Sequence, residues 1–305
     1  MTALQLPRAP RRAKRGGAWL VVLGALSVQS GQAVGKIALP WASPLALVAL
    51  RFGVGALVLW ALFRPRPPTD ARTWRAVLSL GTAVAGVNLF FFESVARLPL
   101  GLAVTVQFLG ALVVSLAGAR RLRHALWALL AVGGVVLINY SPTASDSASA
   151  TGVSWLGLGY AACSAVCWGA YVVLTARVGA RTSGGDGLTW ATTWAAVLTV
   201  PVGVAVDPHA FVVPRVLGCG VGVALLCTVI ANSLELAALR RIPPRVFGVL
   251  VSLDPGVAAL AGLVLLGEKL TLGQWVAVVA IAGASVGVAM DTGGKRPKTT
   301  TSARE

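Results

Sequence analysis

The sequence predicts an all-α protein that crosses a membrane many times. Of its 305 residues, 56% are hydrophobic and only 12% are charged, and the mean hydropathy is +0.80. A soluble domain carries roughly 25% charged residues, so this chain has too few to cover itself with a solvated surface. Its apolar residues come in blocks of about 17–25, the length that spans a hydrocarbon core ~30 Å thick. Composition and block length together predict a polytopic helical membrane protein.

Ten apolar blocks are expected to form transmembrane helices. They cover residues 17–39, 44–63, 76–96, 98–118, 125–140, 153–176, 188–206, 216–239, 246–266 and 270–290. The connections after the third and the ninth block are so short that hydropathy alone does not separate the helices. The charges of the connections have to decide the number of spans.

The basic residues lie in alternate connections, as the positive-inside rule expects of a membrane protein. Both tails are basic, and four connections are rich in arginine: Arg64, Arg66, Arg72 and Arg75; Arg120, Arg121 and Arg123; Arg177 and Arg181; Arg240, Arg241 and Arg245. The connections of the other side carry only Arg97, Arg215 and Lys269. Nine or eleven spans would destroy this alternation. The charges therefore predict ten helices with both termini in the cytoplasm.

Several other classes of protein are disfavoured by the same residues. The net charge of +16 is spread between apolar blocks, which indicates topology rather than nucleic-acid binding. The basic N-terminus resembles the start of a signal peptide but lacks a cleavage site, so the first helix is expected to be retained. The four cysteines lie inside apolar blocks, and the two histidines lie near loops. We expect no disulfide, no metal site and no cofactor.

An internal repeat relates the two halves of the chain. The segment that starts "ESVARLPLGLAVTVQFLGAL" at Glu93 aligns with "ELAALRRIPPRVFGVLVSLDPG" at Glu235, and Trp127 then meets Trp275 after small gaps. Each half supplies five helices, so an odd number turns the second half upside down. The loop charges agree, because "ARLPL" is poor in basic residues where "LRRIPPR" is rich. Inverted repeats are typical of secondary transporters, whose substrate site lies between the repeats near the midplane.

The predicted organisation therefore has five parts. Residues 1–16 form a basic cytoplasmic tail, 17–140 the first five-helix repeat, 141–152 an extracytoplasmic linker, 153–290 the second repeat and 291–305 a cytoplasmic tail.

The chain also resembles a known family through nearly its whole length. The stretches "SVQSGQAVGKIALP", "ALRFGVGALVL", "CWGAYVVLTARVG" and the two repeat segments resemble the EamA-type branch of the drug/metabolite transporter superfamily, and within it the threonine/homoserine exporter group. The resemblance implies a ten-helix secondary transporter that exports small amino acids. Three positions depart from the family's usual pattern: Gln107 and Asp254 each replace a usual Glu, and Ala111 a usual Pro.

Two polar residues fall near the centres of predicted spans. Ionisable groups inside a membrane are costly and point to functional sites. Asp254 lies midway along the ninth block, and Pro255 after it disfavours helical geometry. Asp254 is interpreted as a site for a substrate ammonium or a proton, or as a carboxylate at a kink. Gln107, at the corresponding place in the other repeat, is a neutral hydrogen-bonding candidate.

Two basic residues inside spans are candidates for a substrate carboxylate. Arg51 lies seven residues into the second block, roughly 10 Å from its end. It either binds substrate or forms a structural ion pair. Lys36 is close enough to its helix end to reach the interface, so its role stays open in the same way.

The remaining candidates carry weaker signals. Trp168 and Tyr171 either wall a cavity or pack in the core, and Asn88 and Asn232 are candidates for bonds between helices. Glu93 and its repeat partner Glu235 lie near opposite membrane faces. For Glu93, an ion pair with Arg97 at i+4 competes with a role as a gate or proton site.

These observations predict a secondary active transporter in the bacterial cytoplasmic membrane that exports threonine- or homoserine-like metabolites by alternating access. Alternatives are export of an aromatic amino acid, a purine or a cationic drug, and, from other classes, a membrane enzyme or a non-transporting protein. No nucleophile with its base and no phosphate loop is evident, so we expect no catalysis. The expected partners are a small-molecule substrate, protons and lipid, not nucleic acid. The choice between monomer and homodimer stays open.

Overall fold

The described part of the chain is helical throughout. The computed structural model describes residues 11–117, 154–179, 181–182, 185–239, 241–242 and 244–292, and every regular element in these ranges is a helix. The first half contains α1 (Arg11–Ala38), α2 (Pro44–Phe63), α3 (Ala71–Val95) and α4 (Leu100–Ala117). The second half contains α6 (Trp155–Gly179), α7 (Asp186–Val206), η1 (Pro208–Phe211), α8 (Pro214–Ala224), η2 (Leu225–Ile230), α9 (Ala231–Leu239), α10 (Pro244–Val251), α11 (Asp254–Leu266) and α12 (Leu272–Thr292).

These helices coincide with the apolar blocks of the sequence. Six described stretches are long and apolar enough to cross a membrane, among them Pro44–Phe63 and the composite Pro214–Glu235. The chain is thus a multi-pass membrane protein. The helix expected over 125–140 and the linker over 141–152 lie outside the described residues.

Two helices begin well before their apolar blocks. Helix α1 starts at Arg11, inside the segment expected to be a basic tail, and α3 starts at Ala71 rather than near residue 76. The start of α3 is fixed by Asp70, whose Oδ2 accepts a hydrogen bond from the Thr73 N–H at 2.8 Å. Hydropathy marks only the apolar part of a helix, whereas the helical backbone of α3 extends beyond that part to its capping residue, Asp70.

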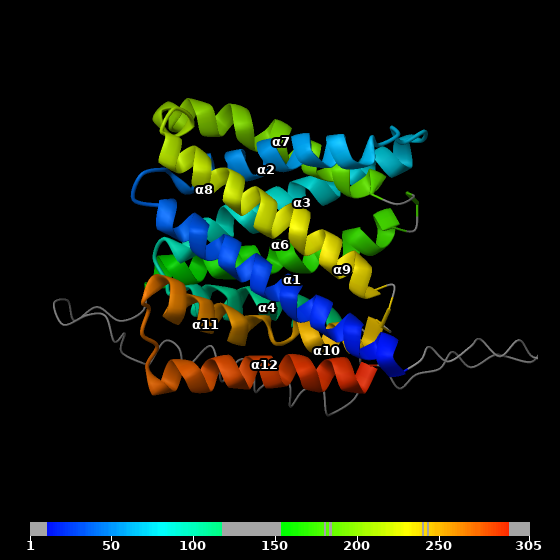
Figure 1. Ribbon diagram of the computed structural model, residues 1–305, viewed down its shortest axis with the longest axis vertical. Coiled ribbons are helices and arrows are strands. Elements are labelled where there is room, and N and C mark those ends of the chain that lie inside the picture. The colour runs from blue at the N-terminus through cyan, green and yellow to red at the C-terminus, as the bar shows by residue number, and fades with distance from the viewer. Residues whose placement is uncertain are drawn as a thin grey trace, which may run out of the picture.

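The helices run side by side across the molecule, and their ends gather at its two edges (Figure 1). The α1–α2, α3–α4, α7–α8 and α11–α12 connections lie at the left edge, and the α2–α3 and α9–α10 connections lie at the right. The right edge contains the described arginines Arg64, Arg66, Arg72, Arg75, Arg177, Arg181 and Arg241. We call it the basic-rich end. The left edge, with Lys36, Arg97, Arg215 and Lys269, is the basic-poor end.

Two of the helical spans are interrupted halfway. Between α8 and α9, the six residues of η2 form a π-helix instead of an α-helix. Between α10 and α11 the helix breaks at Ser252 and Leu253, so that α11 begins with Asp254 and Pro255. Proline at the first turn suits a helix start, because its missing N–H has no intrahelical partner there. The break predicted from "LDPG" is present.

Glycines allow the helices to approach closely. Gly31 of α1 lies against Leu226 and Cys227 of η2, and Gly35 lies against the ring of Phe92 in α3, so a Cβ at either position would clash. Small residues at such spacing let membrane helices pack backbone to backbone.

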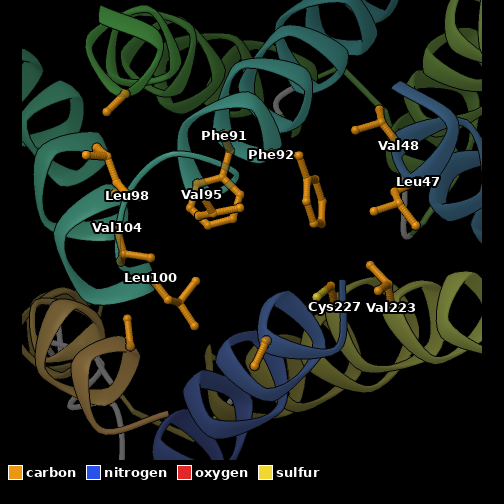
Figure 2. Close-up of a cluster of buried hydrophobic side chains, with 14 of the residues drawn as sticks. Leu47, Val48, Phe91, Phe92, Val95, Leu98, Leu100, Val104, Val223 and Cys227 are labelled. Atoms are coloured by element: carbon orange, nitrogen blue, oxygen red, sulfur yellow. The ribbon is translucent and has the colours of Figure 1, made fainter. Parts of the chain in front are cut away.

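The core lies between α2, α3, α4 and the second half. Phe91 and Phe92 are fully buried and meet edge to face, with ring centroids 5.7 Å apart. In Figure 2 they lie between Leu98, Leu100 and Val104 on one side and Leu47, Val48 and Val223 on the other. This packing fixes α3 at the centre of the bundle.

The close approach of α4 and α6 can be tested at a glycine. A Cβ on Gly110 would clash with the carbonyl oxygen of Ala165, and backbone cannot move aside as a flexible side chain can. We expect Gly110→Ala to lower the free energy of unfolding by about 1–3 kcal/mol. Thermal unfolding of the purified protein in detergent measures the effect.

Gly159→Ala is the matched control on α6, because a Cβ there meets nothing within 4 Å. Alanine is the better helix former by up to ~1 kcal/mol, so this variant should be as stable as the parent or more so. Equal destabilisation by both substitutions would contradict the contact between α4 and α6.

Candidate functional site

A cavity lies where the two halves of the chain meet. Its volume is about 130 Å³. Its walls come from both halves: Val28, Gln29 and Gln32 of α1; Arg51 and Phe52 of α2; Val84, Val87, Asn88 and Phe91 of α3; Val104, Gln107 and Phe108 of α4; Trp168 and Tyr171 of α6; Leu188 and Thr192 of α7; Cys227 and Thr228 of η2; Asn232 and Glu235 of α9; and Asp254 of α11. Most of the predicted site residues therefore line one cavity.

Asp254 reaches this cavity because its helix is interrupted. The eight residues of α10 and the thirteen of α11 make two half-helices of about 12 and 20 Å, which meet near the middle of the span. The N-terminal end of α11, with Asp254 in its first turn, is thus placed at the cavity. In transporters, half-helix ends at the midplane commonly bind substrate or coupling ions.

Arg51 brings the opposite charge to the same cavity from α2. Its Cζ lies 5.8 Å from the centre of the Phe52 ring, which stabilises a cation by its quadrupole. The Nε and Nη1 atoms of Arg51 are buried and have no hydrogen-bond partner in the described part of the chain. The guanidinium is therefore a buried donor group with free N–H bonds.

Arg51 and Asp254 do not neutralise each other. The Oδ1 atom of Asp254 is also buried and without a partner among the described residues. The ion pairs found within those residues are Lys36–Glu268 and Glu93–Arg97, so neither cavity charge takes part in one. Unpaired buried charges are costly. A ligand with a positive and a negative group would offset that cost.

Gln107 is held in place by a chain of hydrogen bonds. Its Nε2 donates to Ser164 Oγ at 2.8 Å, and that hydroxyl donates to the Val87 carbonyl at 2.9 Å. These bonds join α4, α6 and α3 behind the cavity wall. Asn88 Nδ2 likewise donates to the Val84 carbonyl of its own helix at 2.8 Å. The amide of Asn88 is thus bound within α3 and does not bridge helices through this bond.

Aromatic rings form one wall of the cavity. Trp168 stacks on Tyr171 with centroids 5.1 Å apart, and Phe108 lies 6.2 Å from Trp168. Glu235 and Asn232 complete the lining from α9. Glu235 thereby joins Asp254 as a second carboxylate at the cavity.

Lys36 lies outside the cavity lining, in an ion pair at the basic-poor end. Its Nζ is 2.6 Å from Glu268 Oε1 and also donates to the Leu98 carbonyl, while Glu268 Oε2 accepts from the Leu100 N–H at 2.8 Å. This group, which we call the Lys36–Glu268 clasp, joins the end of α1, the α3–α4 connection and the α11–α12 connection. The carboxylate of Glu268 also caps the positive end of α4.

Glu93 also lies outside the cavity lining. Its Oε2 is 2.6 Å from Arg97 Nη1, and the Arg97 guanidinium lies 5.0 Å from the centre of the Tyr160 ring. The expected i,i+4 ion pair is present.

Sequence reasoning missed several polar residues of the site. Gln29 and Gln32 line the cavity from α1, together with Thr192 and Thr228 from the second half. Gln29, Gln32 and Lys36 are spaced three and four residues apart, which places them on one helix face. That spacing in "VQSGQAVGK" was the available signal.

A multi-pass helical bundle around a small cavity lined by ionisable residues is typical of a membrane transporter. The chain belongs to the EamA-like transporter family, whose family model matches residues 155–290. A solved crystal structure shares the fold, with a TM-score of 0.62 over 90% of this chain and 97% of that one, at 20% identity.

Two similar proteins are named for their transported substrates. The threonine/homoserine exporter RhtA of Salmonella typhimurium strain LT2 is 35% identical over 274 residues, which cover 88% of this chain and 91% of that protein. RhtA of Escherichia coli strain K12 is 34% identical over 269 residues, covering 88% and 89%. The similarity extends well beyond the matched family segment into the first half.

The Lys36–Glu268 clasp should contribute strongly to stability. Its side chains are only 20% and 16% exposed, and Glu268→Ala would leave both Lys36 and the Leu100 N–H without a carboxylate. We expect a loss of about 3 kcal/mol in the free energy of unfolding. Thermal unfolding in detergent measures it.

Glu93→Ala is the matched control, because it removes a carboxylate from a more exposed pair on one helix. This substitution should cost less than about 1 kcal/mol. If Glu93→Ala destabilised the protein as much as Glu268→Ala, the clasp would have no special role.

Proposed function

We propose that this protein exports small amino acids of the threonine and homoserine type across the bacterial cytoplasmic membrane by alternating access. The observation that carries the proposal is the pair of ionisable side chains of opposite type, Arg51 and Asp254, which have unpartnered polar atoms at one buried cavity. An amino-acid zwitterion has one group for each of them. The names of the RhtA relatives support the same substrate class.

Charge complementarity assigns the ends of the substrate. The Arg51 guanidinium presents N–H donors in a fork that suits a carboxylate. The Asp254 carboxylate accepts the N–H bonds of an ammonium. Lys36 was an alternative partner for the substrate carboxylate, but its charge is matched by Glu268.

The size of the cavity favours a small substrate. Sites for drug-sized ligands have volumes of about 300–1,000 Å³. A cavity of about 130 Å³ is well below that range. A small amino acid therefore suits it better than an aromatic amino acid, a purine or a cationic drug.

We further propose ten transmembrane helices in two inverted repeats, with both termini cytoplasmic. The helix contacts support this arrangement, because several of the main pairings between the described helices have a counterpart when the halves are exchanged. Helix α1 packs on α8 and α9 as α6 packs on α3, and α2 packs on α8 as α7 packs on α3. The pairs α2–α7 and α4–α11 each join equivalent helices of the two halves, so exchange of the halves leaves these pairs unchanged. The arginines of the basic-rich end support a cytoplasmic location for that end.

Such symmetry provides a mechanism for export. In repeat-built transporters, one repeat or bundle rocks against the other around a fixed site and opens it to each side in turn. The cavity is lined by both halves, so relative motion of the halves would change its access.

The coupling ion we propose is the proton, and Asp254 is its carrier. A carboxylate at the cavity can hold either a proton or the substrate ammonium. Competition between the two at one group links proton entry to substrate exit. Glu235, which lines the same cavity, is the second acid available to this exchange.

Counterflow in proteoliposomes tests the substrate. Vesicles loaded with unlabelled threonine should accumulate labelled threonine and homoserine. Arg51→Met should lower this exchange at least about tenfold, because the substrate carboxylate loses its charged partner.

Arg215→Met is the control for the loss of a basic residue. Arg215 lies over the Trp41 ring at 4.3 Å at the basic-poor end, away from the cavity. Absence of threonine and homoserine exchange by the wild-type protein would refute the proposed substrate.

Proton coupling is tested at Asp254. Asp254→Asn should abolish threonine transport driven by a pH gradient, since the amide cannot carry the proton. The readout is labelled threonine uptake into vesicles with an imposed gradient.

The matched control is Asp207→Asn. Asp207 accepts hydrogen bonds from Ser43 and Ala210 at the basic-poor end and does not line the cavity. Gradient-driven transport by Asp254→Asn at the wild-type rate would exclude Asp254 as the carrier.

A further inference from the structure

Two glutamines of α1 line the cavity without a role in the charge matching described above. Gln29 and Gln32 are only 2% and 9% exposed. They are three residues apart, so both side chains lie on the same face of the helix. The Oε1 atom of each is buried and has no hydrogen-bond partner among the described residues. The cavity therefore contains two free neutral acceptors.

The backbone that bears these glutamines is anchored on both sides. Ser27 Oγ donates to the Leu226 carbonyl of η2 at 2.7 Å, and Cys227 Sγ donates to the Val28 carbonyl at 3.3 Å. Gly31, between the two glutamines, lies against Cys227. The positions of Gln29 and Gln32 are thus set by the contact between α1 and η2. They do not depend on bonds to the glutamine oxygens.

Free acceptors in this position indicate a ligand that donates hydrogen bonds. A buried amide oxygen without a donor costs free energy, and the cost is offset when a ligand supplies an N–H or O–H. Charged partners for an ammonium and a carboxylate are already present in Asp254 and Arg51. The ligand group left to donate a hydrogen bond to a glutamine amide oxygen is therefore a neutral one, such as a side-chain hydroxyl.

We propose that Gln29 and Gln32 form a hydroxyl-recognition subsite, in which their Oε1 atoms accept the hydrogen bond of the substrate's side-chain hydroxyl. This inference rests on the proposed function and makes it more specific. The substrate class is a small hydroxylated amino acid, and its apolar isostere is rejected. Valine is the diagnostic competitor, because it has the shape of threonine with a methyl group in place of the hydroxyl.

The size of the selectivity follows from the chemistry of the subsite. A pocket that fits only by shape rejects an isostere weakly, whereas a site built to bond a hydroxyl is left unsatisfied by an analogue that lacks it. We expect threonine to exchange about 10- to 100-fold better than valine.

The wild-type protein gives the first test, independent of any variant's folding. Proteoliposomes loaded with threonine are offered labelled threonine, valine or O-methylthreonine. O-methylthreonine keeps the oxygen but has no O–H to donate, so it should exchange as poorly as valine. If valine or O-methylthreonine exchanged as well as threonine, the subsite would be refuted.

Two variants assign the selectivity to the glutamines. Gln29→Met and Gln32→Met keep the length of the side chain and remove the acceptor. Each should lower the ratio of threonine to valine exchange by about tenfold. The ratio is measured in one batch of vesicles, so it does not depend on the amount of folded protein. Ratios equal to the wild-type value in both variants would overturn the assignment.

Gln274→Met is the matched control. Gln274 is a fully buried glutamine outside the cavity lining, and its Oε1 accepts from the Thr271 N–H at 3.0 Å at the start of α12. Its substitution should affect stability and leave the ratio unchanged. A ratio that fell as much in Gln274→Met as in the α1 variants would refute a specific role for Gln29 and Gln32.

The outcomes separate the two proposals. If the wild-type protein exchanges threonine and the ratios do not respond to Gln29 or Gln32, the subsite alone fails. If it exchanges neither threonine nor homoserine, the proposed function fails and the subsite with it.

Discussion

The need to satisfy every backbone hydrogen bond inside the hydrocarbon core governs this structure. Water is absent there, so a chain spans the membrane as unbroken helix wherever lipid surrounds it. The described chain interrupts two of its spans, at η2 and at Ser252–Leu253. Residues next to both interruptions line the cavity. Both interruptions thus present part of their irregular backbone to the cavity.

The interruptions and the close helix contacts depend on each other. In η2, the Leu226 carbonyl accepts a hydrogen bond from Ser27 of α1, and Gly31 allows the two segments to approach that closely. At the other interruption, Pro255 begins α11 and Asp254 takes the position at its start. The framework holds polar side chains at fixed positions although those side chains lack partners of their own. Such preorganisation reduces the cost of ordering a site when a ligand binds.

Much of this arrangement could be predicted from the sequence. Helix positions follow from the length of the apolar blocks, and Asp254 and Arg51 attract attention because charges are rare inside such blocks. The break at "LDPG" follows from the effect of proline on its own residue and the one before it. Neutral Gln29 and Gln32 gave no comparable signal, because an amide in an apolar block is often a structural hydrogen-bonding group.

The Lys36–Glu268 clasp could not be predicted for a different reason. Lys36 ends α1 and Glu268 follows α11, and nothing local in either segment indicates its partner. Their pairing depends on how α1, α4 and α11 pack, which the contact of Gly101 with Ala259 helps to set. Side-chain partners distant in the chain are properties of the assembled bundle, whereas spans are properties of each segment.

That pairing also has a consequence for biosynthesis. A growing chain inserts its helices in order, and Glu268 leaves the ribosome only after α11. Until then Lys36 has no carboxylate beside it and keeps its ammonium at the polar interface, as a long basic side chain near a helix end can. The N–H of Leu100 likewise has no Glu268 carboxylate to bond until then. The ends of α1 and α4 at this side therefore gain their shared carboxylate only when nearly the whole chain has been made, and a chain truncated before Glu268 lacks this contact.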